Sequence, residues 1–143
     1  MTARETLGRA AAVICWVYAA GFGLPAIPVG IFVLREHRLP WLWDLFPMYG
    51  GPWSSGGMTE SAFVATLGGF LALLVVVAAG AWLLWTGRRS GAVVVLATIP
   101  VEAIFWWGFA LPIPPVMALA RVVLVMFAWP GLRGGSASIV GPA

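Results

Sequence analysis

The chain is poor in charged residues and in side chains that bind metals. Only 9% of its 143 residues are Asp, Glu, Lys or Arg, and it holds one cysteine, Cys15, and one histidine, His37. A single cysteine excludes a disulfide within the chain and a redox-active thiol pair. One cysteine and one histidine are also too few soft ligands for a zinc or copper site built by one chain. We therefore expect no metal and no cofactor.

Apolar residues take the place of the missing charge. They make up 62% of the chain, and the mean hydropathy is +0.98, whereas about half of a soluble domain is apolar and about a quarter is charged. A core of this size could not hide so much apolar surface from water, so the chain is predicted to lie in a membrane. Lysine, asparagine and glutamine are absent. All three use A-rich codons, which suggests a GC-rich bacterial genome and hence the cell membrane of a bacterium.

Four apolar runs are each long enough to cross a bilayer, which takes about 20 residues. The predicted fold is an all-α integral membrane protein, a four-transmembrane-helix bundle with one aromatic-rich outer loop at 35–59, and residues 1–143 form a single membrane domain. The first run resembles a secretory signal but exceeds the usual signal core and lacks a small-x-small cleavage site. Pro25 and Pro28 predict a kink near its outer end. The spans are predicted at about 10–34, 62–85, 92–111 and 113–129.

The arginines predict the orientation of the bundle. Five flank one side of the spans, and two, Arg35 and Arg38, flank the other. Because basic residues resist translocation, both termini are predicted to be cytoplasmic and the 35–59 loop to face outward. The arginines are scattered at span edges rather than clustered in a stripe, so no nucleic-acid partner is expected. The five on the cytoplasmic side are Arg4, Arg9, Arg88, Arg89 and Arg133.

The outer loop is unusually aromatic for a connection between spans. Pro40 and Pro47 predict a short helix lying flat at the membrane surface. Two interpretations of its side chains remain open: a lid at headgroup level, where aromatic residues gather, or a surface that binds a larger partner. The residues of this predicted partner surface are Trp41, Trp43, Asp44, Phe46, Tyr49 and Trp53.

Two ionised residues, Glu102 and Arg121, lie within the predicted third and fourth spans. Glu102 precedes Leu111 by nine residues, and Arg121 follows Pro112 by nine. At 1.5 Å per residue, antiparallel helices would carry both about 13 Å from the outer end, near the middle of the hydrocarbon core. A charge at that depth costs about 2.5–3.5 kcal/mol on insertion scales, so pairing or protonation is expected.

The intramembrane pair Glu102 and Arg121 allows two interpretations. It could be structural and fix the register of two helices, or it could be a polar site that moves a proton or holds an anionic headgroup. Helical spacing places a possible binding wall beside the pair. Its members are Phe105, Trp106, Phe109 and Met117.

A short internal repeat accompanies the proline-rich segments. GFGLPAIPV at 21–29 matches GFALPIPPV at 108–116. Gly/Pro-broken segments at corresponding positions of a repeat can mark a binding site in transporters, although helix breaking alone, or chance, also explains such a match.

Three functions remain open from the sequence. The first is an accessory, assembly or interaction subunit of a larger membrane complex. The second is a small transporter or lipid- or anion-binding carrier that uses Glu102 and Arg121, as a homo-oligomer. The third, an intramembrane enzyme acting on a lipid-linked substrate, would need Asp44 or His37 as its acid or base. The expected partners are membrane lipids and either a larger membrane protein or further copies of the chain.

Overall fold

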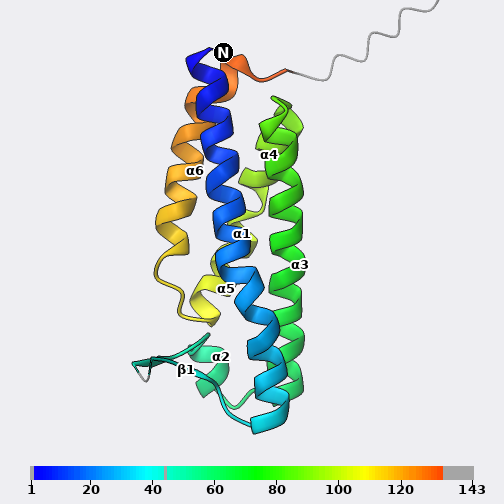
Figure 1. Ribbon diagram of the computed structural model, residues 1–143, viewed down its shortest axis with the longest axis vertical. Helices are drawn as coiled ribbons and strands as arrows, with labels where there is room; N and C mark the ends of the chain where they lie inside the picture. Colours follow the sequence, from blue (N-terminus) through cyan, green and yellow to red (C-terminus); the bar gives the residue numbers. More distant parts are fainter. Residues whose placement is uncertain (1, 44, 134–143) are drawn as a thin grey trace, which may run out of the picture.

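The computed structural model describes residues 2–43 and 45–133, and these are mostly helical. Asp44, one of the residues predicted for the partner surface, lies outside the described residues. The long helices run side by side, with the amino terminus and the end of the last helix at one end, and the short strands at the other (Figure 1). We call these the terminal end and the hairpin end. The elements in chain order are α1 (Ala3–Glu36), β1 (Trp41–Leu42), β2 (Phe46–Pro47), α2 (Pro52–Ser55), α3 (Glu60–Trp85), α4 (Arg89–Ala97), α5 (Ile99–Gly108), α6 (Pro114–Ala128) and the 3₁₀ turn η1 (Trp129–Gly131).

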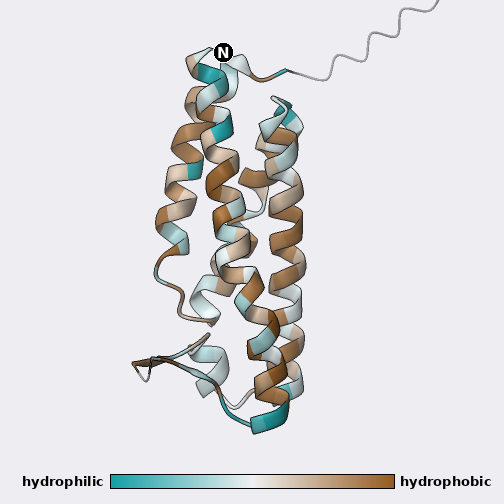
Figure 2. Ribbon diagram, in the orientation of Figure 1, coloured by the Kyte–Doolittle hydropathy of each residue, from teal (hydrophilic) through white to brown (hydrophobic). Residues whose placement is uncertain are grey.

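Four helical segments are long and apolar enough to cross a membrane, at the positions predicted from the apolar runs. They are Ala3–Glu36, Glu60–Trp85, Arg89–Gly108 and Pro114–Gly131. Apolar residues fill the middle of the helices, and hydrophilic residues gather toward the two ends (Figure 2). Large apolar side chains also lie on the outside, such as Leu24 at 66% exposed and Leu119 at 65%. A bilayer accepts such a surface, whereas water would not.

Helix α1 runs through both of its prolines. It begins with a capping box in which Thr2 and Glu5 satisfy each other's backbone N–H groups, and it ends at His37, whose φ of 56° is left-handed. Pro25 and Pro28 lie inside this 34-residue helix. A proline supplies no N–H, so Pro25 cannot donate to the carbonyl of Gly21 and Pro28 cannot donate to that of Leu24.

The predicted third span is two helices rather than one. Helix α4 ends at Ala97 and α5 begins at Ile99, with Thr98 between them. Pro100 explains the break, because it has no N–H for the carbonyl of Leu96 and its ring crowds the preceding turn. The hydroxyl of Thr98 donates to the carbonyl of Val95 at 3.1 Å, which satisfies a polar group where the helix is interrupted.

The segment between α1 and α3 differs from the sequence prediction. The predicted short helix from Pro40 to Pro47 was wrong: β1 and β2 form an antiparallel hairpin in which Trp41 pairs with Pro47 and Leu42 with Phe46. Two turns of isolated helix are marginal in water, whereas the hairpin satisfies backbone groups through Met48 N–H to Pro40 O at 2.8 Å. We call residues 41–47 the aromatic hairpin.

Side chains that follow the aromatic hairpin fasten it to the long helices. The hydroxyl of Tyr49 donates a hydrogen bond to the carbonyl of Phe22 in α1. Burial raises the pKa of the Tyr49 hydroxyl to about 12, so it remains a donor near neutral pH. Trp53 of α2 packs edge-on against Phe105 and Phe109. The loop is therefore a packed part of the fold.

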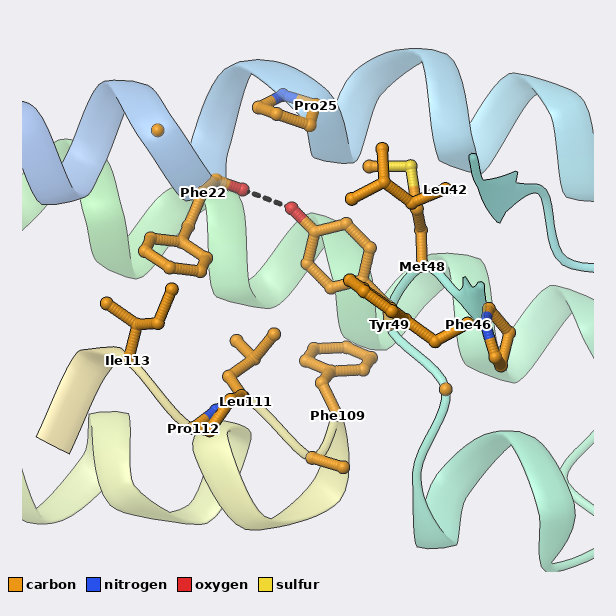
Figure 3. A pocket seen from close by; sticks show the side chains of 14 residues that line it. Phe22, Pro25, Leu42, Phe46, Met48, Tyr49, Phe109, Leu111, Pro112 and Ile113 are labelled. Atoms are coloured by element: carbon orange, nitrogen blue, oxygen red, sulfur yellow. Dashed lines mark hydrogen bonds between the residues drawn. The ribbon is translucent and has the colours of Figure 1, made fainter. Parts of the chain in front are cut away.

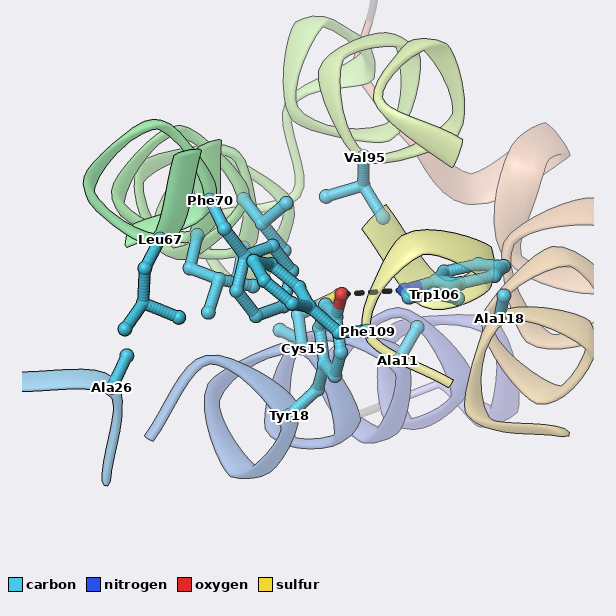
Figure 4. Packing of buried hydrophobic residues seen from close by; sticks show 14 of the residues in the cluster. Ala11, Cys15, Tyr18, Ala26, Leu67, Phe70, Val95, Trp106, Phe109 and Ala118 are labelled. Atoms are coloured by element: carbon cyan, nitrogen blue, oxygen red, sulfur yellow. Dashed lines mark hydrogen bonds between the residues drawn. The ribbon is translucent and has the colours of Figure 1, made fainter. Parts of the chain in front are cut away.

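A cavity of about 610 Å³ remains beside the aromatic hairpin. Side chains from α1, from the segment 42–50 and from the α5–α6 bend surround it, with the Tyr49 hydroxyl reaching toward the α1 backbone (Figure 3). The main hydrophobic core lies next to this region, where α1, α3, α5 and α6 meet (Figure 4).

Helices α3 and α4 approach closely at Gly91. A Cβ added at Gly91 would lie 2.3 Å from the backbone nitrogen of Leu84 and 2.6 Å from the carbonyl oxygen of Gly80. Backbone atoms cannot move aside as a flexible side chain can. Only a glycine at position 91 therefore allows the two helices to approach this closely.

Gly91→Ala should lower the stability of the folded chain by about 1–3 kcal/mol, the usual effect of overpacking. Thermal unfolding of the protein in mild detergent, followed by circular dichroism, measures the change. Gly68→Ala is the matched control, because a Cβ at Gly68 meets no atom within 4 Å; it should keep or raise the unfolding temperature. Equal effects of the two substitutions would contradict the close-contact explanation.

Candidate functional site

Glu102 and Arg121 form a buried ion pair between α5 and α6. Arg121 Nη2 lies 2.6 Å from Glu102 Oε2, and Nη1 lies 3.3 Å from Oε1. This is the two-pronged geometry in which a guanidinium matches a carboxylate best. Both side chains are 0% exposed. Two charges that would each be costly in an apolar medium therefore neutralise one another.

A tyrosine of α1 completes the surroundings of the pair. The Arg121 guanidinium carbon lies 5.0 Å from the centre of the Tyr18 ring, within cation–π range. The Tyr18 hydroxyl accepts a hydrogen bond of 2.8 Å from the indole N–H of Trp106 in α5, shown by the dashed line in Figure 4. The pair is thus connected to three helices. Arg121 Nε has no hydrogen-bond partner among the described residues.

Most of the predicted binding wall belongs to the packed core. Phe105 and Phe109 lie in a cluster of aromatic rings with Phe70, at centroid distances of 5.3 and 5.8 Å. Trp106 is 8% exposed and is held by Tyr18. Met117 is partly buried against the same core. Phe109 also lines the cavity beside the aromatic hairpin, whereas the other three are absent from its lining.

The residues of the predicted partner surface divide into two groups. Tyr49 is 6% exposed and Trp53 is partly buried, so both face the long helices. Trp41, Trp43 and Phe46 are 56%, 82% and 53% exposed. The aromatic hairpin therefore has an anchored side and a free side, and the free side carries large apolar rings.

His37 lies at the hairpin end and pairs with a residue that the sequence analysis did not connect to it. Its Nδ1 lies 2.7 Å from Oε2 of Glu60, at the start of α3. The contact with Glu60 raises the pKa of the imidazole above its ordinary value. The contact joins the end of α1 to the beginning of α3. The Nδ1 of His37 is thus engaged by Glu60.

Sequence reasoning missed Tyr18 and Glu60. The signal for Tyr18 was a hydroxyl in the middle of an otherwise apolar run, since a buried tyrosine usually finds a hydrogen-bond partner. For Glu60 no local signal exists, because His37 is 23 residues away along the chain. Among the described residues, no group of three or more His, Cys, Asp or Glu side chains could hold a metal.

We find no match to this chain among protein-family models, curated proteins or solved structures. A function for this chain is therefore inferred from its geometry alone.

Removing one member of the buried pair should be far more harmful than removing both. Glu102→Gln leaves the Arg121 charge buried without a counter-ion, and we expect a loss of about 3–5 kcal/mol. Glu102→Gln combined with Arg121→Met removes both charges and should recover most of that loss. The unfolding temperature in detergent and the fraction of monodisperse protein measure both. A double variant no better than the single one would contradict a pairing role.

The His37–Glu60 contact predicts a measurable pH dependence. Because the folded pKa of His37 is raised, its contribution to stability is fully present below the unfolded value of about 6.5 and is lost as the pH rises through the folded value. NMR titration of the single imidazole should give a pKa above 6.5. Glu60→Gln should return it toward 6.5, whereas Glu36→Gln should change it less. An unshifted wild-type pKa would contradict the contact.

Proposed function

We propose that this chain is an accessory or assembly subunit of a larger membrane complex, held in a bacterial cell membrane as a four-helix bundle. The observation that carries the proposal is the contrast between a sealed polar pair and a fixed, exposed aromatic hairpin. The buried pair ties α5 to α6, and the exposed His37–Glu60 contact joins the end of α1 to the start of α3. Its most unusual exposed feature is a hydrophobic projection at one end.

The aromatic hairpin has the properties of a preorganised contact surface. Backbone hydrogen bonds hold its two strands, and the Tyr49 and Trp53 anchors hold it against the long helices. Trp43 is nonetheless 82% exposed, and Leu45 is 71% exposed. A large ring held in place loses little entropy on binding, and tryptophan is common among residues that dominate binding energy. A larger membrane protein with an apolar recess is the partner that this surface fits.

The other two functions receive less support from the geometry. A carrier that uses Glu102 and Arg121 would have to open a pair whose side chains are both fully buried. An enzyme that uses His37 would act through Nε2, because His37 is 71% exposed and contacts Glu60 through Nδ1. The hollow that His37 lines is only about 130 Å³, below the 300–1,000 Å³ typical of small-molecule sites.

The arrangement of arginines supports cytoplasmic termini and an external aromatic hairpin. Arg4, Arg9 and Arg133 line one small hollow at the terminal end. Arg88 pairs with Arg133 through the backbone, and Arg89 N–H donates to the Arg133 carbonyl at 3.1 Å. Five arginines thus gather at one end, which the positive-inside rule assigns to the cytoplasm.

A two-residue change on the free side of the aromatic hairpin tests the subunit proposal. Tagged protein is extracted from its own membrane in mild detergent and examined by native mass spectrometry. We expect a larger protein at fixed stoichiometry with the wild type and at least about tenfold less of it with Trp43→Ser combined with Leu45→Ser, as for loss of a central aromatic contact.

Trp107→Ser is the matched control, since Trp107 is 67% exposed but lies on α5. It should retain the partner. A partner that survives the hairpin substitutions, or a chain that carries only lipid or further copies of itself, would overturn the proposal. A specific transport or catalytic activity of the purified chain alone in liposomes would also overturn it.

A further inference from the structure

The cavity beside the aromatic hairpin is lined almost entirely by apolar groups. Its volume of about 610 Å³ falls within the 300–1,000 Å³ typical of small-molecule sites. The lining side chains shown in Figure 3 come from three separate segments, and Tyr49 supplies the hydroxyl among them. That hydroxyl is already bonded to the Phe22 carbonyl. An occupant would therefore meet hydrocarbon surfaces on nearly every side.

The two repeated sequence segments converge on this cavity. Phe22 and Pro25 of the first segment line it, as do Phe109 and Pro112, the residues at the same positions of the second. The segments differ in backbone, because the first stays within α1 and the second forms the α5–α6 bend. Both segments contribute a phenylalanine and a proline to the lining of the same cavity.

The rim of the cavity is continuous with the apolar exterior. Ile113 is 59% exposed and Phe46 is 53% exposed, and both line the cavity. Two other lining residues, Tyr49 and Ala110, have φ of 54° and 50°. Left-handed backbone at residues other than glycine is costly and is often found where a ligand is held.

The depth of the cavity along α1 also fits lipid chains. Tyr18, which contacts Arg121, lies nine residues beyond Arg9 at the terminal end, which is about 14 Å and close to mid-membrane. Gly21 to Pro25 lie about 5–10 Å further along the helix. The cavity is therefore within the leaflet on the hairpin side, in its hydrocarbon layer.

A second hollow continues the same face of α1 away from the cavity. Pro28, Phe32 and Arg35 follow Gly21 and Pro25 at helical spacing, and they line this hollow of about 280 Å³ together with Ile31 and Glu36. Arg35 lies about 15 Å beyond Pro25 along the helix. Measured from Tyr18 near mid-membrane, Phe32 lies about 21 Å along the helix, at the headgroup level of a bilayer about 40–45 Å thick in all. Arg35 lies about 25 Å along it, just outside that level, and its side chain starts back toward the membrane because helical Cα–Cβ bonds tilt toward the amino terminus.

A second arginine stands at the same level. The guanidinium carbon of Arg38 lies 5.4 Å from the centre of the Phe32 ring. Arg35 and Arg38 are both exposed. Arg35 lines the second hollow with Glu36, and Arg38 lines another with Glu60, whose carboxylate is paired with His37. Two guanidinium groups are well suited to a phosphate.

We propose that this face of α1 binds one anionic phospholipid of the leaflet on the hairpin side, with an acyl chain in the cavity and its phosphate at Arg35 and Arg38. The assignment is separate from the subunit proposal, because it uses Leu42, Phe46 and Pro47 of the aromatic hairpin and the α5–α6 bend, whereas the subunit proposal is tested at Trp43 and Leu45. It also does not involve Glu102 or Arg121.

A photoreactive lipid tests the site. The full-length chain is reconstituted in vesicles of phosphatidylethanolamine and phosphatidylglycerol that contain phosphatidylglycerol with a diazirine in one acyl chain. Illumination and peptide mapping should place crosslinks on 21–25, 46–50 and 109–113 in excess over the lipid-facing residues of α6, such as Leu119.

Gly21→Leu is the variant that fills the cavity. A Cβ at Gly21 meets no atom within 4 Å, so leucine enters open space without forcing the helix apart. We expect crosslinking at the cavity to fall about tenfold, because each displaced methylene accounts for roughly a fourfold change in affinity. Gly68→Leu, on α3 and equally unobstructed, should leave it unchanged.

The charge requirement is tested separately. Arg35→Gln combined with Arg38→Gln should lower crosslinking by about 25-fold, since each arginine near a lipid headgroup contributes about a fivefold effect. Arg133→Gln at the terminal end is the control and should have no effect. Unfolding temperatures of all variants confirm that they remain folded.

Three results would overturn the assignment. Even crosslinking over all lipid-facing surfaces would show that the cavity holds no particular lipid. Displacement of the probe by an equimolar polyprenyl phosphate would assign the cavity to an isoprenoid chain instead. An absence of lipid adducts at these segments, together with a dimer of the chain in native mass spectrometry, would show that a second copy fills the cavity.

Discussion

The ion pair between Glu102 and Arg121 constrains the rest of the structure. Each charge alone would be costly at this depth, and the two are compatible with an apolar environment only while they stay together. Their contact fixes the register of α5 against α6, and the Tyr18 ring against Arg121 fixes both relative to α1. Among the described residues, Nε of Arg121 has no hydrogen-bond partner. Buried pairs of this kind specify geometry more than they add stability.

The position of the pair also explains why α1 is left uncovered by α5 and α6 at the hairpin end. The α5–α6 bend comes soon after the pair and meets α1 at the level of Phe22, through the contacts of Tyr49 with both Phe22 and Phe109. From Phe22 to Glu36, however, α1 continues for about 21 Å. Because α5 and α6 meet at this bend, they leave a space beside the longer helix α1. Tyr49, Trp53 and the aromatic hairpin occupy part of that space, and the cavity is the part left over.

The sequence predicted the long helices because apolar runs of this length have few alternatives, and it predicted equal depths for Glu102 and Arg121 because helical rise is constant. It did not predict that the two side chains meet, since helix rotation about a proline-rich bend is not encoded in spacing. It failed between Pro40 and Pro47 because proline can begin a helix or border a short strand, and tertiary contacts decided. The His37–Glu60 contact depends on how α1 and α3 pack, which no local pattern records.

The buried Glu102–Arg121 pair lies in the middle of the molecule, and the apolar cavity lies at its hairpin end. A proton or anion pathway through Glu102 would require a polar route to a group that is fully buried. At the hairpin end, by contrast, the apolar cavity is lined by the exposed residues Phe46 and Ile113, and Arg35 lines a second hollow along the same face of α1. A bound lipid there would support the anchored side of the aromatic hairpin and hold its free side in place. The lipid would then contact the anchored side of the aromatic hairpin, and the partner would contact its free side.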